Sequence, residues 1–295
     1  MLNGQTNTQE AGTVPVGTEA LVEKVRERYG KIATGEMPSC CGTGDPEEAV
    51  ALQIGYGKDV LAKAPDGANL GLGCGAPIGF LALAAGETVL DLGSGGGLDA
   101  FLAADKVGRT GRVIGVDMTP AMVERARVNA TKAGLANVEF REGRLEALPI
   151  AADSIDAVTS NCVINLVPDK EAVFKEIARV LKPGGRLVVS DIILDGELPE
   201  VLRTDLLAYV GCVSGAMLRA DYFGRLEAAG LGRVELLKDV DYLAAVAGTL
   251  PEEAQALLDR SGVSRAALAG KVRSVTYRAT KSASCCGPSC CGGAD

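Results

Sequence analysis

The chain has 295 residues, of which 47% are hydrophobic and 23% charged, a composition typical of a globular protein with a substantial core. Its net charge of −8 and its aromatic content of 4% argue against nucleic acid as a partner. The absence of histidine excludes Ser-His and Cys-His nucleophiles and histidine-based zinc enzymes.

The N-terminal part is predicted to be polar and disordered over residues 1–18, followed by a helical and loop segment over 19–86. Apolar residues at helical spacing predict a helix over 18–33. The first ten residues lack the basic and apolar regions of a signal peptide, and no apolar stretch is long enough for a membrane span. We therefore expect a cytoplasmic protein without membrane contact, whose cysteines stay reduced.

Strands alternate with helices of ten or more residues over 87–193, which predicts an α/β fold with a parallel sheet. The remainder is less regular. Helical stretches are predicted at 199–212 and 221–229, and the alternating residues 271–281 predict a late strand. We expect 194–281 to form a smaller α+β C-terminal domain and 282–295 a mobile tail.

A glycine-rich loop begins at Asp91 with the sequence DLGSGGG, between a predicted strand and a predicted helix. Its glycines allow close approach of a ligand at the carboxyl edge of the sheet. Asp117 ends the next strand and can accept hydrogen bonds from the two hydroxyls of a ribose. A dinucleotide site usually carries GxGxxG, whereas this loop reads DxGxGxG, which favours a methyltransferase over a dehydrogenase.

The loop resembles the first motif of the S-adenosylmethionine-dependent methyltransferases, and VLKPGGRLVVSD (180–191) resembles a later motif of that superfamily. The resemblance implies a Rossmann-like fold and S-adenosylmethionine as the cofactor. Many relatives have an acid where Arg144 stands, so one adenine contact differs here. The residues that the resemblance assigns to the cofactor are Asp91, Gly93, Ser94, Gly95, Gly97, Asp117, Met118, Leu145, Glu146 and Asn161.

Three cysteines carry a more specific signal. Cys162 directly follows the fourth predicted strand of the 87–193 block, and Cys212 lies on a predicted helix, so either could be a core residue. Cys74 lies in a glycine-rich loop, where a core residue is not expected. The motifs LGCG, GVDMT, SNCVINL and GCVSGA together resemble the arsenite methyltransferases over about residues 20–280.

That resemblance implies that Cys74, Cys162 and Cys212 are catalytic and bind trivalent arsenic. It also implies that an upstream cysteine, either Cys40 or Cys41, exchanges disulfides with Cys74. Trivalent arsenic is soft and prefers sulfur ligands. Glutathione or thioredoxin is expected as a thiol co-reactant, because methylation moves arsenic towards the pentavalent state.

The tail carries two cysteine pairs whose role stays open: Cys285, Cys286, Cys290 and Cys291. They could form a four-thiol zinc site, but adjacent pairs differ from the usual C-x2-C spacing. We favour accessory arsenic binding. Two other functions share part of the pattern: a C-methyltransferase acting on a quinone-like metabolite, and a non-catalytic, thiol-rich arsenic-binding protein.

Overall fold

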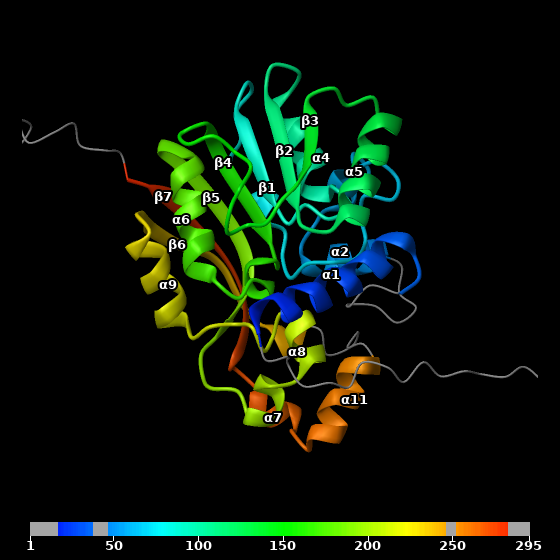
Figure 1. Ribbon diagram of the computed structural model, residues 1–295, viewed down its shortest axis with the longest axis vertical. Coiled ribbons are helices and arrows are strands. Elements are labelled where there is room, and N and C mark those ends of the chain that lie inside the picture. The colour runs from blue at the N-terminus through cyan, green and yellow to red at the C-terminus, as the bar shows by residue number, and fades with distance from the viewer. Residues whose placement is uncertain (1–16, 38–46, 246–251, 283–295) are drawn as a thin grey trace, which may run out of the picture.

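The computed structural model describes residues 17–37, 47–245 and 252–282. Within these residues seven strands form one sheet in the order β3-β2-β1-β4-β5-β7-β6 (Figure 1). The strands are β1 (Thr88–Leu92), β2 (Arg112–Asp117), β3 (Val138–Glu142), β4 (Ile155–Asn161), β5 (Leu181–Leu194), β6 (Leu231–Asp241) and β7 (Val272–Lys281).

The first five strands pair in parallel, whereas β7 lies antiparallel between β5 and β6. This arrangement confirms the α/β, Rossmann-like fold. The segment expected as a smaller C-terminal domain contributes two strands to the central sheet. The helices of that segment run from α7 (Glu200–Arg203) to α12 (Arg265–Leu268) and include α9 (Arg219–Ala228).

The longer helices are α1 (Thr18–Thr34), α2 (Glu47–Ile54), α4 (Leu98–Val107), α5 (Pro120–Lys132), α6 (Lys170–Val180), α9 (Arg219–Ala228) and α11 (Glu252–Ser261). The short helices are α3 (Lys58–Leu61), η1 (Pro77–Gly79), η2 (Ile164–Leu166), α7 (Glu200–Arg203), α8 (Leu206–Val210), α10 (Tyr242–Ala245) and α12 (Arg265–Leu268). Among the described residues, no helix combines the length and the hydropathy that crossing a membrane requires.

Helices cover both faces of the sheet. Successive residues of a strand point to opposite faces, and apolar residues on both faces of β1 pack against these helices. On β1, Leu90 packs into the core that Phe174 of α6 and Tyr222 of α9 complete. Its neighbour Val89 packs into a second core with Phe101 of α4 and Val123 of α5. Figure 1 shows α6 and α9 together on one side of the sheet. Both faces of the parallel strands are therefore buried.

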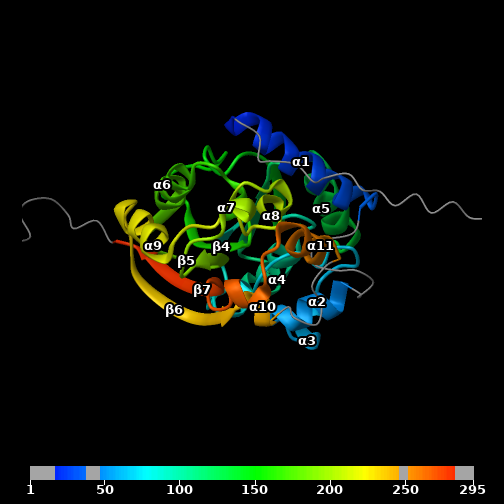
Figure 2. The same ribbon diagram turned by 90° about the horizontal axis from the view of Figure 1, so that it is seen from below.

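The carboxyl ends of the parallel strands are covered by α1 and by the short helices after β5 (Figures 1 and 2). The Tyr29 hydroxyl of α1 donates to the carbonyl of Val210 at 3.2 Å, which ties α1 to the end of α8. The helical stretch predicted at 199–212 is two helices, because the Asp205 carboxylate caps α8 by accepting from the Ala208 N–H at 3.1 Å. Cys212 therefore follows α8 and does not lie on a helix.

Candidate active site

The glycine-rich loop joins β1 to α4 and bends back onto β2. The backbone N–H groups of Gly93 and Ser94 both donate to the carbonyl of Val116, at 2.8 and 3.1 Å. Gly93 has a φ of 65°, and a Cβ there would overlap the Val163 side chain. Glycine at this position therefore permits both the turn and the close approach of the segment that follows β4.

Asp117 lies at the carboxyl end of β2, beside the loop. Its carboxylate accepts from the Gly95 N–H at 3.0 Å and from the Thr119 N–H at 2.8 Å. Burial raises the pKa of Asp117, and these hydrogen bonds oppose that rise. Each carboxylate oxygen has a second acceptor position, so the group retains the capacity to bind two ribose hydroxyls.

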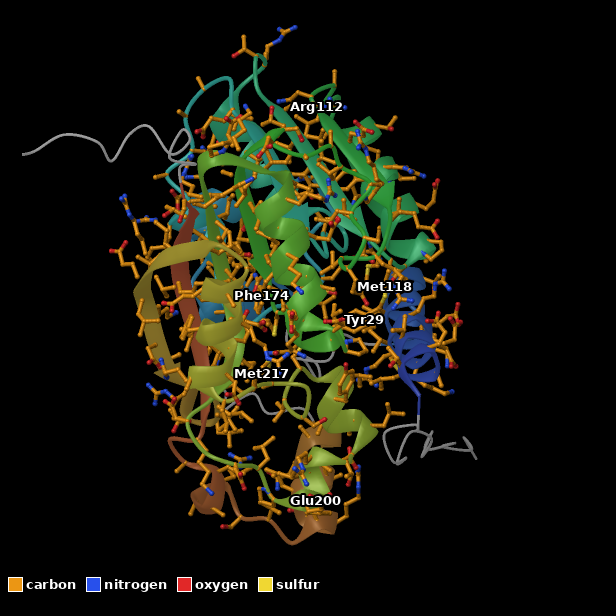
Figure 3. The ribbon with its side chains drawn as sticks, turned by 60° about the vertical axis from the view of Figure 1, so that its left-hand side comes forward. Tyr29, Arg112, Met118, Phe174, Glu200 and Met217 are labelled. Atoms are coloured by element: carbon orange, nitrogen blue, oxygen red, sulfur yellow. The ribbon has the colours of Figure 1, made fainter. Side chains whose placement is uncertain are left out.

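One cavity brings most of the predicted residues together. Tyr29 of α1 and Met118 lie on the same side of the molecule (Figure 3), and both line this cavity. Gly97 is not part of the lining; it is the N-cap of α4, with a φ of 97°. The predicted residues that line the cavity are Asp91, Gly93, Ser94, Gly95, Asp117, Met118, Leu145, Glu146, Asn161, Cys162 and Cys212.

These residues fit S-adenosylmethionine. The Asp91 Oδ2 and Ser94 Oγ atoms are buried without a hydrogen-bond partner among the described residues, and buried polar atoms are normally satisfied. Both lie where the loop would meet the methionine part of the cofactor. Leu145 is buried and adds an apolar side chain to the lining of the same cavity. The Arg144 guanidinium, in place of an acid, donates to Glu146 at 3.0 Å and to Glu19 of α1 at 2.9 Å.

The three predicted arsenic ligands come from separate parts of the chain and meet beside this cavity. The Cys162 thiol hydrogen-bonds with the sulfurs of both Cys74 and Cys212. The Cys212 Sγ–H also donates to the Cys162 carbonyl at 2.9 Å. Cys74 and Cys212 are buried, whereas Cys162 is half-buried. Cys162 therefore links the other two cysteines, and its sulfur lies within 4.8 Å of that of Cys74. The three residues are called the sulfur cluster below.

Backbone hydrogen bonds hold the three cysteines in position. The Cys74 N–H donates to Asn161 Oδ1 at 3.1 Å, and its carbonyl accepts from Ser274 of β7 at 2.6 Å. The Cys162 N–H donates to the Ser190 carbonyl at 2.8 Å. Cys162 and Cys212 have φ values of 60° and 64°, in the left-handed region that non-glycine residues rarely adopt.

The environment keeps the Cys162 thiol protonated. The hydrogen bond from Cys212 lowers its pKa, but the hydrogen bond with Cys74, burial and the charge of Asp191 outweigh that effect and hold the pKa well above its usual range. A sulfur ligand binds a soft centre as the thiolate, so binding at Cys162 must release a proton.

Sequence reasoning missed three residues around these groups. A carboxylate oxygen of Asp191 lies within 4.8 Å of the sulfurs of Cys74 and Cys162. Tyr56 and Asp99 line the cofactor cavity, where the Tyr56 hydroxyl donates to the Asp99 carboxylate at 2.8 Å. An acid in the first turn of a helix is ordinary, so Asp99 carried no signal of its own.

Asp191 is already engaged by its neighbours. It accepts hydrogen bonds from Asn165 at 2.8 Å and from the Tyr222 hydroxyl at 3.1 Å. Burial raises its pKa to about 7, although the charge of Lys170 opposes that rise. A carboxylate is a hard ligand, whereas the sulfurs of Cys74 and Cys162 beside it suit a soft centre.

Six further cysteines with predicted roles, namely Cys40, Cys41, Cys285, Cys286, Cys290 and Cys291, lie outside the described residues. Their assignment to a disulfide relay or to accessory arsenic binding stays a prediction.

The sheet, the glycine-rich loop and Asp117 define the class of S-adenosylmethionine-dependent methyltransferases. A family model described as a methyltransferase domain matches residues 83–249. An arsenite methyltransferase of Halobacterium salinarum is 44% identical over 242 residues, which are 78% of this chain and 62% of that protein. The chain belongs to the arsenite methyltransferase family.

Two further comparisons place the chain within this class. The crystal structure of an arsenic(III) S-adenosylmethionine methyltransferase from Chlamydomonas reinhardtii matches with a TM-score of 0.58 and 32% identity, over 81% of this chain and 75% of that one. A demethylmenaquinone methyltransferase of Lactococcus lactis is 42% identical over 103 residues, 35% of this chain and 41% of that protein. The chain spans about three fifths of the length of the first two curated arsenite methyltransferases that it matches.

Replacing Asp117 with alanine is expected to weaken S-adenosylmethionine binding by about 1.5–3 kcal/mol, because the ribose hydroxyls lose a charged acceptor. Titration calorimetry with the purified variant measures the change. Unchanged affinity would show that Asp117 serves the loop, through Gly95 and Thr119, and not the ribose.

Proposed function

We propose that this chain transfers methyl groups from S-adenosylmethionine to trivalent arsenic held by Cys74, Cys162 and Cys212. One observation carries the proposal. Cys162 and Cys212 line the same cavity as the glycine-rich loop and Asp117, and the Cys162 thiol contacts the sulfur of Cys74. The methyl-donor site and the sulfur cluster therefore adjoin each other, as transfer between them requires.

Three sulfur ligands suit the electronic structure of the substrate. Trivalent arsenic bound to three thiolates is pyramidal and retains a lone pair, which can serve as the nucleophile. No general base is then needed at the substrate atom, which agrees with a chain that contains no histidine. The cysteines act by positioning: they fix the direction of the lone pair relative to the cavity.

The residues of the loop and its surroundings would hold the cofactor. Bound there, S-adenosylmethionine supplies an electrophilic methyl group. Asp117 would accept from the ribose, and Met118 and Leu145 would lie against the adenine. Asn161 adjoins both sites, since it lines the cofactor cavity and its side chain accepts from the Cys74 N–H at 3.1 Å.

A thiol co-reactant completes the proposed reaction. Methylation formally takes arsenic from the trivalent to the pentavalent state, and two electrons return it to the trivalent state. Two thiols of glutathione or thioredoxin can supply them by forming one disulfide. We propose that the enzyme works in a reducing compartment such as the cytoplasm, where its cysteines also stay reduced.

The reaction is tested by incubating the purified chain with arsenite, S-adenosylmethionine and glutathione and measuring methylated arsenic by chromatography with elemental detection. Methylated arsenic supports the proposal. Tight arsenite binding without turnover would instead identify a binding protein. Methylation of a quinone precursor without arsenic methylation would identify the C-methyltransferase activity, which shares the cofactor site but has no use for three clustered sulfurs.

Ending the chain at Ser282 is expected to leave the melting temperature and the methylation rate at saturating arsenite unchanged. β7 ends at Lys281, so this truncation keeps every strand that the described residues form. It removes four of the nine cysteines. The full-length chain is the control, and loss of all activity at saturating arsenite would place the tail within the site.

A further inference from the structure

Four acidic residues line the cofactor cavity: Asp91, Asp99, Asp117 and Glu146. Of the described residues that line the cavity, Arg144 carries a positive charge, and it is already paired with Glu19 and Glu146. Asp117 is held by two backbone N–H groups, whereas Asp91 Oδ2 is buried without a partner among the described residues. The charged groups that line the cavity therefore favour a cationic ligand.

Asp99 lines the cavity and is linked to the Cys74 backbone through the side chain of Asn161. Its carboxylate accepts from the Tyr56 hydroxyl at 2.8 Å and from Asn161 Nδ2 at 3.5 Å. The same Asn161 side chain accepts a hydrogen bond from the Cys74 N–H. Asn161 also directly precedes Cys162 in the sequence. Since the transferred methyl group must lie between the loop and the sulfur cluster, Asp99 stands beside the centre that carries it.

The two neighbouring carboxyls Asp91 and Asp99 differ in their ionisation. Burial raises the pKa of both, and the charge of Asp99 raises that of Asp91 further. Hydrogen bonds from Tyr56 and Asn161 limit the rise for Asp99, whose pKa is about 6, whereas that of Asp91 is well above its usual range. The geometry favours the ionised form at Asp99, which accepts hydrogen bonds from Tyr56 and Asn161, over Asp91, whose Oδ2 accepts none among the described residues.

We propose that Asp99, positioned by Tyr56 and Asn161, is the counter-charge of the sulfonium and makes the cavity favour the charged methyl donor over its uncharged product. The inference rests on the cofactor assignment made above. In the transfer the sulfur–methyl bond breaks, its electron pair stays on sulfur, and a neutral thioether remains. S-adenosylhomocysteine then lacks the charge that Asp99 attracts, which favours its release.

The test is calorimetric binding without arsenic, using three ligands: S-adenosylmethionine, S-adenosylhomocysteine, and sinefungin, which carries an amine in place of the sulfonium. Asp99→Asn is expected to weaken S-adenosylmethionine and sinefungin by about tenfold or more, as for the loss of a charged partner. S-adenosylhomocysteine should change by less than about threefold. The matched control is Asp105→Asn. Asp105 lies on the same helix, and its exposed carboxylate pairs with Lys63.

A measurement on the unmodified chain gives a second test that does not depend on whether the variant folds. The groups that face Asp99 are Tyr56, Asn161 at the end of β4, and Asp91 at the end of β1. As the pH falls through about 6, Asp99 becomes protonated. The preference for S-adenosylmethionine over S-adenosylhomocysteine should then decline.

Equal weakening of all three ligands, or no weakening of any, would overturn the inference, as would a preference that is constant between pH 5 and pH 8. Failure of the unmodified chain to bind S-adenosylmethionine would instead refute the proposed function. Because arsenic is absent from these titrations, a failed arsenite assay leaves their result interpretable.

Discussion

Serine in place of Cys162 or Cys212 is expected to reduce arsenite methylation by at least about a hundredfold, the cost of misplacing a reacting atom by about 1 Å. The substitution preserves size but exchanges a soft sulfur for a hard oxygen, so arsenic loses a ligand that directs its lone pair. S-adenosylmethionine binding should persist, because the loop and Asp117 are untouched. Turnover on arsenite, calorimetry and a melting curve measure the three effects.

Cys74→Ser offers an informative comparison. If Cys74 also takes part in a disulfide exchange with Cys40 or Cys41, its loss should reduce turnover on arsenite more than on monomethylarsenite, which needs fewer thiol ligands. Core cysteines would behave differently, with modest destabilisation and near-normal rates for all three variants. Robust arsenite methylation by Cys162→Ser or Cys212→Ser would remove the ligand assignment for that residue.

Alanine at Gly75 is expected to displace Cys74 and to lower arsenite methylation by about tenfold or more. A Cβ there would lie 2.5 Å from Ser190 Oγ and 3.2 Å from Thr276 Oγ1, and both side chains are buried. Neither can withdraw easily, so the loop must move, at a cost of about 1–3 kcal/mol of stability. Turnover and thermal unfolding of the variant measure the two effects.

The matched control is Gly79→Ala, because a Cβ at Gly79 of η1 meets no atom within 4 Å. Gly79 lies four residues from Gly75. The Gly79→Ala variant should retain both the activity and the melting temperature of the unmodified chain. If Gly75→Ala were as active as this control, the position of the Cys74 loop would not limit the reaction.

The cofactor half of the site was accessible from the sequence because its signals are local. A strand, a glycine-rich loop and a helix lie in one short segment, and Asp117 ends the next strand. Parallel strands bring their carboxyl ends to one edge, so the proximity of Gly93, Asp117 and Cys162 follows from the fold. Cys74 and Cys212 were assigned through the resemblance to a family, since no local pattern places them beside Cys162.

The remaining features depend on contacts between distant residues. Tyr56 and Asp99 are 43 positions apart, and only the folded chain joins them. Asp191 belonged to a recognised motif, but its closeness to Cys74 depends on how the loop before η1 returns to β5. The alternation over 271–281 predicted a strand, but not its antiparallel place between β5 and β6. Asp205, within a stretch predicted as helix, starts a new helix there.

The left-handed backbone of Cys162 and Cys212 has a consequence for engineering this chain. A non-glycine residue held in that conformation costs about 1–3 kcal/mol, and glycine would relieve the cost at either position. Variants chosen for heat resistance alone would therefore accept glycine at two positions where the proposed reaction needs sulfur. A laboratory evolution scheme for this scaffold needs survival on arsenite as its criterion, since thermal screening by itself rewards the loss of the proposed arsenic ligands.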